Sequence, residues 1–366
     1  MPNDKSIVAL LPFVVRGALS LIVLRAMRER GFDVTIAYYM RRAEGYTADE
    51  CADFKKDGRL LNLGETTSDE AIALISDTCR QRNAHLLLQI GAPQAYRQIP
   101  YIREKCRDLL VYDILYNPMG HTVNHFLYES AFDAAIVESR AMEAFVNNNT
   151  SLPGKVTHVM ESGIDLADFF PKPNSNSNEH HFVLGYVGRM SPEKNPLGFI
   201  ELAEKLAERL PGLRFRIFGE GPQLNDVQER LHVSKAADVI QLDGYIPHVR
   251  DAMHMIDLLV VPSKLDGRPN IVMEANACGV PVIGAPVGGI PELIDEGVNG
   301  YIKAPSDING IAAVVSAFIS DPDIRSSLQK NSRSAAELRF DRNRMLDDYG
   351  NLFSITALES RPSSGQ

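Results

Sequence analysis

Residues 258–285 read LLVVPSKLDGRPNIVMEANACGVPVIGA and contain, in order, an apolar strand, a polar loop, a helical pattern and a second apolar strand. Apolar strands that alternate with helices are typical of βαβ units, in which helices cover a buried parallel sheet. This stretch therefore predicts an α/β fold. It also places a polar loop at the carboxyl end of a strand, where such folds bind ligands.

The same alternation extends in both directions along the chain. It predicts further strands at residues 6–15, 33–39, 85–90, 109–116, 134–139, 155–164, 182–188, 214–219 and 239–244. Helical patterns separate many of these strands, and one such pattern runs from Ile308 to Leu338. Residues 342–360 are amphipathic and precede a loose tail, so we expect a final helix there.

The segment PKPNSNSNEHH at residues 171–181 is rich in Pro, Asn and Ser and has no periodicity, which is typical of a linker. A chain of 366 residues suits two α/β domains. We therefore expect a first Rossmann-like domain at 1–168, a linker at 169–181, a second domain at 182–340 and a C-terminal helix with a tail at 341–366.

Composition excludes several classes of protein. The net charge of −9 argues against a nucleic-acid partner, because such domains are usually basic. No apolar run reaches the roughly 18 residues of a membrane span, and the first residues favour a buried strand over a signal peptide. The cysteines lack the spacing of a metal site, so we expect reduced thiols in a cytoplasmic protein; they are Cys51, Cys79, Cys106 and Cys278.

A group of arginines near the start of the chain leaves peripheral membrane contact open. The group lies near Tyr38 and Tyr39 and comprises Arg16, Arg25, Arg28, Arg30, Arg41 and Arg42. Such a group can touch the anionic inner face of a membrane, or it can be a solvated helix face.

The segment GRMSPEKNP at residues 188–196 combines a strand end, a glycine turn and a helix start. Arg189 and Lys194 lie in its loop, and Asn195 followed by Pro196 suits the N-cap and first position of a helix. Two cations beside a helix N-terminus can cradle a diphosphate. The alternative is a pair of solvated surface cations.

The loop and helix of the opening stretch carry two carboxylates, Asp266 and, eight positions later, Glu274. The amides near Asn270, Ile271 and Val272 are free to meet an anion at the helix start. Glu274 lies among apolar neighbours, where a carboxylate is costly without a partner. A ribose diol would be such a partner, and a structural salt bridge is the alternative.

Two glycine segments, FGEGP at 218–222 and GGIPE at 288–292, also follow predicted strands. Each alone predicts only a turn before a helix. In order, however, GRMSPEKNP, IFGEGP, LDGYIP and LVVPSKLDGRPNIVMEANACGVPVIGAPVGGIPELIDEGVNGYI resemble the donor domain of the family-4 retaining glycosyltransferases, which have the GT-B architecture. The first half resembles the family only in outline, through LLPFVVRGALSLIVLRAMRERGFDVTIAY and MESGIDLADFFP.

The resemblance implies two Rossmann-like domains facing across a cleft, with acceptors on the first, the donor on the second and a C-terminal helix crossing back to the first. Arg189 and Lys194 would hold the donor diphosphate in place of a metal, so no metal is expected. It also implies that Glu274 binds the ribose and that Asp266 faces the sugar. The remaining roles that it implies are a phosphate-closing loop at Gly17, phosphate contacts at Asn270, Ile271 and Val272, and base contacts at Gly244, Tyr245 and Ile246.

Three positions depart from the family pattern. Asp266 stands where the family usually has glutamate, and Gly17 is a single glycine where the family often has two. Asp113 stands where the family often has a histidine close to the reacting sugar. His121 is an equal candidate for that catalytic position, and either residue can instead belong to a loop outside the site.

The resemblance thus implies a retaining transfer from a nucleotide-sugar, with UDP expected before GDP, to a hydroxyl of a glycan, glycolipid, protein or small molecule. Bacterial surface-glycan or glycolipid assembly is the expected setting. The alternatives are a non-catalytic nucleotide-sugar-binding protein and a GT-B epimerase. A dehydrogenase is disfavoured, because no GxGxxG follows the first strand.

Overall fold

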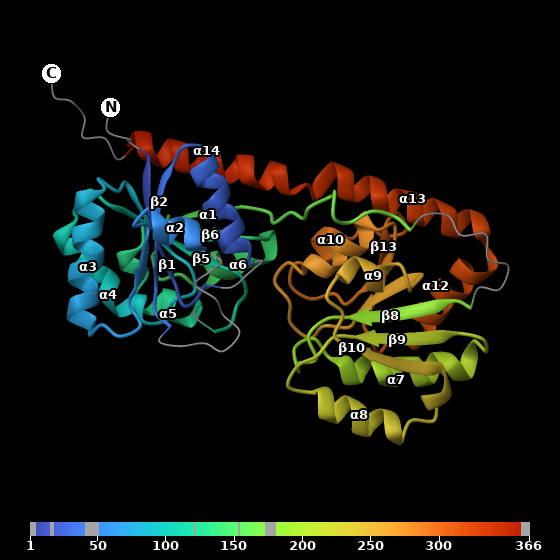
Figure 1. Ribbon diagram of the computed structural model, residues 1–366. Helices are drawn as coiled ribbons and strands as arrows, with labels where there is room; N and C mark the ends of the chain where they lie inside the picture. The colour runs from blue at the N-terminus through green and yellow to red at the C-terminus, as the bar shows by residue number, and fades with distance from the viewer. Residues whose placement is uncertain are drawn as a thin grey trace. The chain divides into compact units, whose positions relative to one another are not determined.

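The computed structural model describes residues 5–14, 18–40, 51–120, 122–152, 154–172 and 181–359. They form two compact units, one from the described parts of 1–161 and 345–366 and the other from those of 162–344. Each unit is a parallel sheet with helices on both faces (Figure 1). The α/β prediction with two Rossmann-like domains is therefore confirmed.

The sheet of the first unit has seven parallel strands in the order β3-β2-β1-β4-β5-β6-β7. They are β1 (Ser6–Leu11), β2 (Asp33–Tyr38), β3 (Leu60–Asn62), β4 (Leu86–Gln89), β5 (Leu110–Leu115), β6 (Ala134–Val137) and β7 (Val156–Val159). The helices of this unit are α1 (Leu19–Glu29), α2 (Ala52–Lys56), α3 (Ser68–Gln81), α4 (Ala95–Lys105), α5 (Thr122–Leu127), α6 (Arg140–Asn149) and α14 (Arg342–Glu359), with a 3₁₀ turn at Glu129–Ala131. The strand order reverses between β1 and β4.

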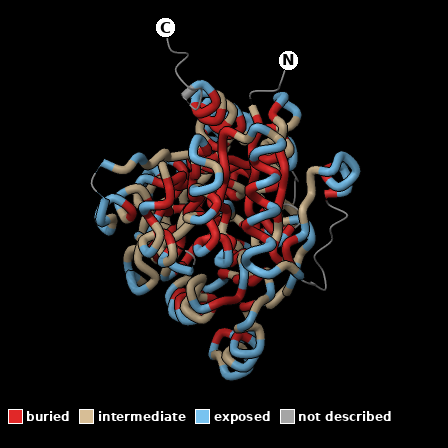
Figure 2. The backbone as a smooth tube through the Cα atoms, turned by 90° about the vertical axis from the view of Figure 1, so that its left-hand side faces the viewer, coloured by how far each residue is buried: buried red, intermediate tan, exposed pale blue. Residues whose placement is uncertain are grey.

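Strand β1 shows why these strands are apolar on both sides. Ile7 and Ala9 pack in one core cluster with α1 and α14, whereas Val8 and Leu10 pack in another with α3 and α4. Successive side chains of a strand point to opposite faces, so a sheet covered on both faces needs apolar residues at every position. Figure 2 shows the result, with buried segments inside and exposed residues along the outer helices.

Helix α14 follows the second unit in sequence but belongs to the first. Met345, Tyr349 and Phe353 recur every four residues and are buried in the same core as β1 and α1. The ring of His85, just before β4, lies with its Nε2 3.3 Å from the carbonyl oxygen of Phe353. The predicted return of the C-terminal helix to the first unit is thus confirmed.

The sheet of the second unit has six parallel strands in the order β10-β9-β8-β11-β12-β13. They are β8 (Val183–Val187), β9 (Arg214–Phe218), β10 (Ile240–Gly244), β11 (Leu258–Val261), β12 (Val282–Gly284) and β13 (Gly300–Ile302). The helices are α7 (Pro196–Arg209), α8 (Leu224–His232), α9 (Val249–Met253), α10 (Asn270–Ala277), α11 (Ile290–Leu293), α12 (Ile308–Ser320) and α13 (Pro322–Arg339), with a 3₁₀ turn at Ala237–Val239. Here the strand order reverses between β8 and β11.

Two helix starts in the second unit show detail that the sequence pattern did not give. The helical pattern from Ile308 to Leu338 is two helices, because Asp321 caps the second through the amides of Asp323 and Ile324. Pro322 then takes the first helical position, where its missing N–H costs nothing. At the start of α7, Asn195 does occupy the N-cap, but with φ 57° and without a side-chain cap. Its amide group donates instead to the carbonyl of Pro262 at 3.0 Å.

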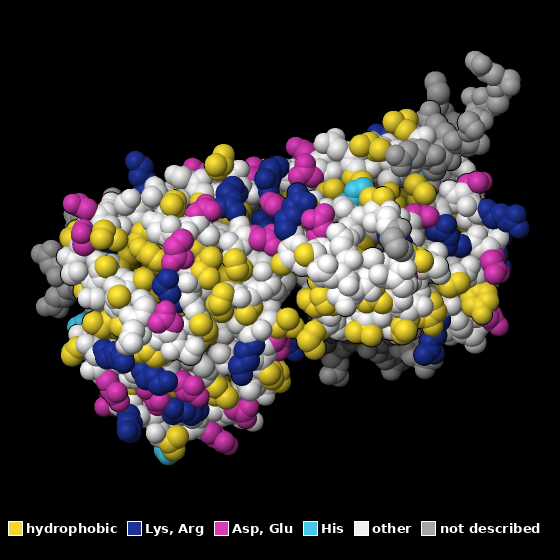
Figure 3. Space-filling view, turned by 180° about the vertical axis from the view of Figure 1, so that it is seen from behind, with side chains coloured by type: hydrophobic (Ala, Val, Ile, Leu, Met, Phe, Trp, Pro, Cys, Tyr) yellow, Lys and Arg dark blue, Asp and Glu magenta, His cyan; other side chains and the backbone are white. Residues whose placement is uncertain are grey.

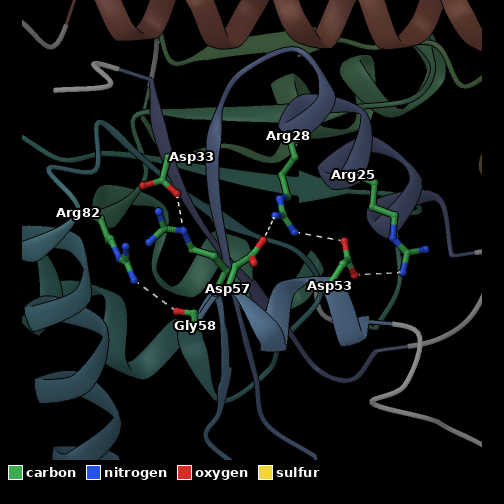
Figure 4. Close-up of polar contacts among 8 residues, drawn as sticks. Arg25, Arg28, Asp33, Asp53, Asp57, Gly58 and Arg82 are labelled. Carbon is green, nitrogen blue, oxygen red and sulfur yellow. Dashed lines mark hydrogen bonds and ion pairs between the residues drawn. The ribbon is translucent and has the colours of Figure 1, made fainter. Parts of the chain in front are cut away.

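The described arginines near the start of the chain are paired with acids, and Figure 4 shows the pairs of Arg25 and Arg28. Arg28 contacts Asp53 and Asp57, and Arg25 lies 3.8 Å from Asp53. Arg30 pairs in turn with Asp347 of α14. The pairing favours a solvated helix face over a lipid-binding cluster, while Arg16, Arg41 and Arg42 lie outside the described residues.

The surface shown in Figure 3 carries Lys and Arg side chains interspersed with Asp and Glu, and apolar side chains lie scattered between them. Within the described ranges, no helix combines the length and the apolar character of a membrane span.

Candidate functional site

A pocket of about 540 Å³ lies at the carboxyl edge of the second sheet. Parallel sheets bind ligands at this edge, beside the point where the strand order reverses. The loops after β8, β9, β10 and β11 and the first turns of α10 form the walls. Its lining includes Gly188, Arg189, Lys194, Gly219, Glu220, Gly221, Tyr245, Ile246, Ser263, Asp266, Asn270, Ile271 and Glu274.

Glycines allow the loops of this pocket to touch. Gly219 has φ 131°, and a Cβ there would lie 1.9 Å from the carbonyl oxygen of Gly188. Gly288 has φ 53°, and a Cβ there would lie 1.6 Å from the carbonyl oxygen of Asp266. Neither approach is open to a residue with a side chain. The four glycine and cation segments singled out in the sequence are therefore brought together.

The cation Lys194 is held by Asp266. Its Nζ lies 2.6 Å from the Asp266 Oδ2, which also accepts a hydrogen bond from the Ser263 hydroxyl at 3.1 Å. Lys194 keeps about a third of its side chain exposed (31%), whereas Asp266 is buried (8%). Arg189 is exposed at the rim of the same pocket. The ion pair fixes the Lys194 ammonium at the pocket wall and offsets part of its charge.

Glu274 is the contrasting carboxylate of the pocket. It lies a turn into α10, and no described residue forms a hydrogen bond or an ion pair with its side chain. Burial raises the pKa of this carboxyl from 4.5 to about 7. The structural salt bridge weighed as an alternative is therefore not found within the described chain, and a ligand hydroxyl would supply the missing donor.

Some of the remaining predicted residues line the pocket, and the backbone groups of others are bonded within the protein. Asn270 and Ile271 line the pocket, but Val272 is buried and its amide already donates to the carbonyl of Pro269 at 3.2 Å. The expectation of a free Val272 amide was therefore wrong. Tyr245 and Ile246 line the pocket as well, whereas the Gly244 carbonyl accepts from Gly219 at 2.7 Å and serves to join two loops.

In the first unit, Asp113 on β5 has no exposed surface. Its Oδ2 accepts a hydrogen bond from the Tyr96 hydroxyl at 2.9 Å and lies 2.8 Å from the Nδ1 of His125. A side chain buried in this way does not touch a substrate, so the geometry does not favour the catalytic role considered for Asp113. His121 and Gly17 lie outside the described residues.

His125 and Tyr96 were missed in the sequence, although both bond to Asp113. His125 follows His121 by four residues, one helical turn, which was the available signal. Tyr96 gave no signal, because its contact depends on how α4 packs on the sheet. Among the described residues, no group of three or more His, Cys, Asp or Glu side chains could hold a metal ion.

The sequence matches to known proteins include a family model that falls on the second unit. The family described as glycosyl transferases group 1 matches residues 169–335. The 2-deoxystreptamine N-acetyl-D-glucosaminyltransferase of Niallia circulans is 28% identical over 171 residues, 46% of this chain and 44% of that protein. The UDP-Gal:alpha-D-GlcNAc-diphosphoundecaprenol alpha-1,3-galactosyltransferase of Escherichia coli is 28% identical over 198 residues, 50% of this chain and 49% of that protein. The match thus spans about half the length of these curated relatives.

Solved structures match nearly the whole chain. Alr3699/HepE of Anabaena, in complex with UDP, has a TM-score of 0.76 at 18% identity and covers 96% of this chain and 100% of its own. The apo form of the lipopolysaccharide outer core galactosyltransferase WaaB has a TM-score of 0.76 at 14% identity and covers 96% and 99%. This likeness shows the fold, which is GT-B. At residues 169–335, in its second unit, the chain is thus similar to the glycosyl transferases group 1 family.

Proposed function

We propose that the chain is a retaining glycosyltransferase that moves a sugar from a nucleoside-diphosphate sugar to a hydroxyl acceptor. The pocket of the second unit carries this proposal, because cations and an unpaired carboxylate line one cavity at the reversal of strand order. Cations bind a diphosphate, and a carboxylate without a partner can accept hydrogen bonds from a ribose diol. UDP-sugars are the first choice and GDP-sugars the second, since HepE was solved with UDP and the Escherichia coli relative is named for UDP-Gal.

In the proposed reaction, the bond between the anomeric carbon and the donor phosphate oxygen breaks, and a bond from that carbon to the acceptor oxygen forms. The acceptor proton passes to the departing phosphate, so a glycoside and a nucleoside diphosphate are released. Negative charge grows on the leaving diphosphate, beside Arg189 and Lys194. A positioned charged donor of this kind contributes about 3 kcal/mol to the transition state.

The other roles are proposed from the same geometry. Glu274 accepts hydrogen bonds from the ribose, the amides of Asn270 and Ile271 meet the phosphates, and Tyr245 with Ile246 contacts the base. Asp266 orients Lys194 and faces the sugar. No divalent metal is required. Relatives named for colanic acid and for lipid-linked glycan synthesis support a place in surface-glycan assembly.

Non-catalytic nucleotide-sugar binding is the second candidate, and two observations favour it. Asp266 is already paired with Lys194, and Asp113 is buried away from solvent. Binding without donor turnover in the presence of acceptors would establish this alternative.

The test is a thermal titration of the protein with UDP, GDP, ADP, dTDP and CMP and their sugars, without added metal. A ligand at 100 times its Kd stabilises by about 2.7 kcal/mol, which shifts Tm by a few degrees. A selective shift that disappears in Glu274→Ala is the expected result. The absence of a shift with every nucleotide contradicts the proposal.

A further inference from the structure

Asn195 is the last residue of the loop at 188–195, which carries the two cations of the pocket in the second unit, and its backbone is unusual. Its φ of 57° and ψ of 51° lie in the left-handed region. Among the described residues, Asn83 is the single other non-glycine residue with a positive φ. Glycine adopts this conformation at the lowest cost, so the backbone by itself does not require a side chain at this position.

The side chain of Asn195 joins its loop to the segment that follows β11. The Nδ2 donates to the carbonyl oxygen of Pro262 at 3.0 Å, and Pro262 lies in the wall of the pocket. An Asn at an N-cap usually accepts a hydrogen bond from the first turn of its helix, but the Asn195 side chain makes no such cap. This side chain therefore serves the contact between two loops and not the start of α7.

The two residues that precede Asn195 bond to the same segment. The carbonyl oxygen of Glu193 accepts a hydrogen bond from the amide of Lys264 at 2.7 Å. The Nζ of Lys194 lies 2.6 Å from the Oδ2 of Asp266. The backbone of Lys194 is thus held between two neighbours, each of which is tied to the loop that supplies its carboxylate partner.

Gly198, in the first turn of α7, makes room for the Asn195 side chain. A Cβ at Gly198 would lie less than 3.0 Å from the Nδ2 and the Cγ of Asn195. Ala is otherwise the better residue inside a helix, so the packed amide of Asn195 explains the glycine. The sequence gives up helix propensity here and keeps the contact with Pro262.

We propose that Asn195 is a positioning residue that holds Lys194 in place for the diphosphate of the donor. The inference rests on the proposed function, which assigns Lys194 to that diphosphate. The ammonium of Lys194 has three N–H donors, so its bond to Asp266 leaves others for phosphate oxygens. A long, flexible side chain loses less entropy on binding when its backbone is already fixed, which is what the contact with Pro262 supplies.

Calorimetric titration of the full chain with UDP and with GDP tests this role. Asn195→Gly keeps the left-handed backbone and removes the amide. Asn83→Gly is the matched control, because Asn83 has the same left-handed backbone and is exposed in the first unit. We expect the tighter of the two nucleotides to bind about tenfold more weakly to Asn195→Gly and within about twofold of wild type to Asn83→Gly.

A double-mutant cycle distinguishes the positioning of Lys194 from a general loosening of the loop. In the Lys194→Ala background, Asn195→Gly should change the affinity by less than about twofold, because the cation through which Asn195 acts is gone. Gly198→Ala repeats the test if Asn195→Gly does not fold, since its Cβ displaces the Asn195 amide while Ala favours the helix. We expect a similar, about tenfold loss of affinity in Gly198→Ala.

Equal affinity of wild type and Asn195→Gly overturns the proposal, and so does an undiminished loss in the Lys194→Ala background. Release of nucleotide from nucleotide-sugars reports separately on the proposed function. If wild type binds the nucleotide but transfers no sugar to any acceptor, the proposed transfer fails, while a tenfold loss in Asn195→Gly still supports the positioning of Lys194. Binding of neither nucleotide to wild type overturns both.

Discussion

Each unit has a pocket at the carboxyl edge of its parallel sheet, and the described residues that line the two pockets differ in charge. Arg189, Lys194 and Glu274 are among the charged residues that line the pocket of the second unit. Among the described residues that line the pocket of the first unit, Arg97 is the single charged one, and hydroxyls and amides surround it. The fold therefore supplies the place, and the loops that follow the strands decide what can bind there.

The two units also differ in how their buried carboxylates are bonded. Asp113 is buried and bonded by Tyr96 and His125, whereas Glu274 opens on a pocket with no described partner. A carboxylate that the protein has already satisfied serves structure. Glu274 has no donor among the described residues and a pKa raised to about 7, which is consistent with the ribose contact that we propose for it.

The largest expected effect distinguishes a lysine of the charged pocket, which is the pocket of the second unit, from a lysine on the nearby surface. Lys194→Ala should lower donor turnover about 100-fold, because the leaving diphosphate loses a positioned cation. Lys264→Ala, an exposed lysine of the next loop, should stay within about twofold. Steady-state release of UDP from UDP-sugars measures both variants. Similar rates in the two would remove the cation from the mechanism.

The charged pocket could be predicted in the sequence because its parts are local. Gly188, Arg189 and Lys194 follow one apolar strand, and Asp266 and Glu274 follow another, so each loop was visible by itself. Periodicity likewise predicted the strands and helix α14, whereas the return of α14 to the first unit was implied by the family resemblance. The ion pair between Lys194 and Asp266 could not be predicted, because its members are 72 residues apart and meet only through strand order.

The pocket of the first unit was not predicted from the sequence, and the reason is physical. Its lining residues Tyr39, Gln98 and Ser68 come from three separate segments, and none of them lies in a recognisable motif. Burial of Asp113 likewise depends on how α4 and α5 pack over β5, which periodicity does not report. The split of the helical pattern at Asp321, by contrast, could have been seen from the Asp-Pro pair.

A pair of matched substitutions sharpens the contrast between the carboxylates. Asp113→Asn should lower the free energy of unfolding by about 2 kcal/mol, since it weakens hydrogen bonds to a buried charge. Glu274→Gln should leave the stability unchanged or raise it at pH 8, because it removes a charge that burial disfavours. Urea unfolding at pH 8 measures both. Equal losses in the two variants would mean that Glu274 is a structural residue after all.

The pH dependence of nucleotide affinity tests the role of Glu274 in this contrast between the two carboxylates. With its pKa near 7, Glu274 holds a proton at pH 6, whereas ribose hydroxyls donate best to the ionised form. The affinity of wild type for UDP should therefore rise by up to about tenfold from pH 6 to pH 8 relative to Glu274→Gln. Calorimetric titration of both proteins isolates this change from the titration of UDP itself. Parallel pH profiles would exclude Glu274 from ribose binding.

The free energy of unfolding should change with pH in the opposite direction to the affinity for UDP. The folded state keeps the Glu274 proton that the unfolded state releases above its ordinary pKa of 4.5, so the free energy of unfolding should fall as pH rises from 4.5 to about 7. Glu274→Gln should remove this part of the fall.

The smallest expected effect concerns the arginines near the start of the chain, which lie outside both pockets. Arg28→Gln should lower the free energy of unfolding by less than about 1 kcal/mol, because its pairs with Asp53 and Asp57 are partly exposed. Flotation with anionic vesicles should give the same bound fraction for this variant as for wild type. A clear loss of vesicle binding would restore this helix face as a membrane contact.

Helix α14 affects the order in which the chain can fold during synthesis. The core around β1 includes Met345, Tyr349 and Phe353, which the ribosome adds only after the whole second unit has been made. The second unit is continuous in sequence and can close as soon as it emerges. The unit that is begun first is thus completed last, and until then the apolar surface that α14 will cover remains open to chaperones and to aggregation.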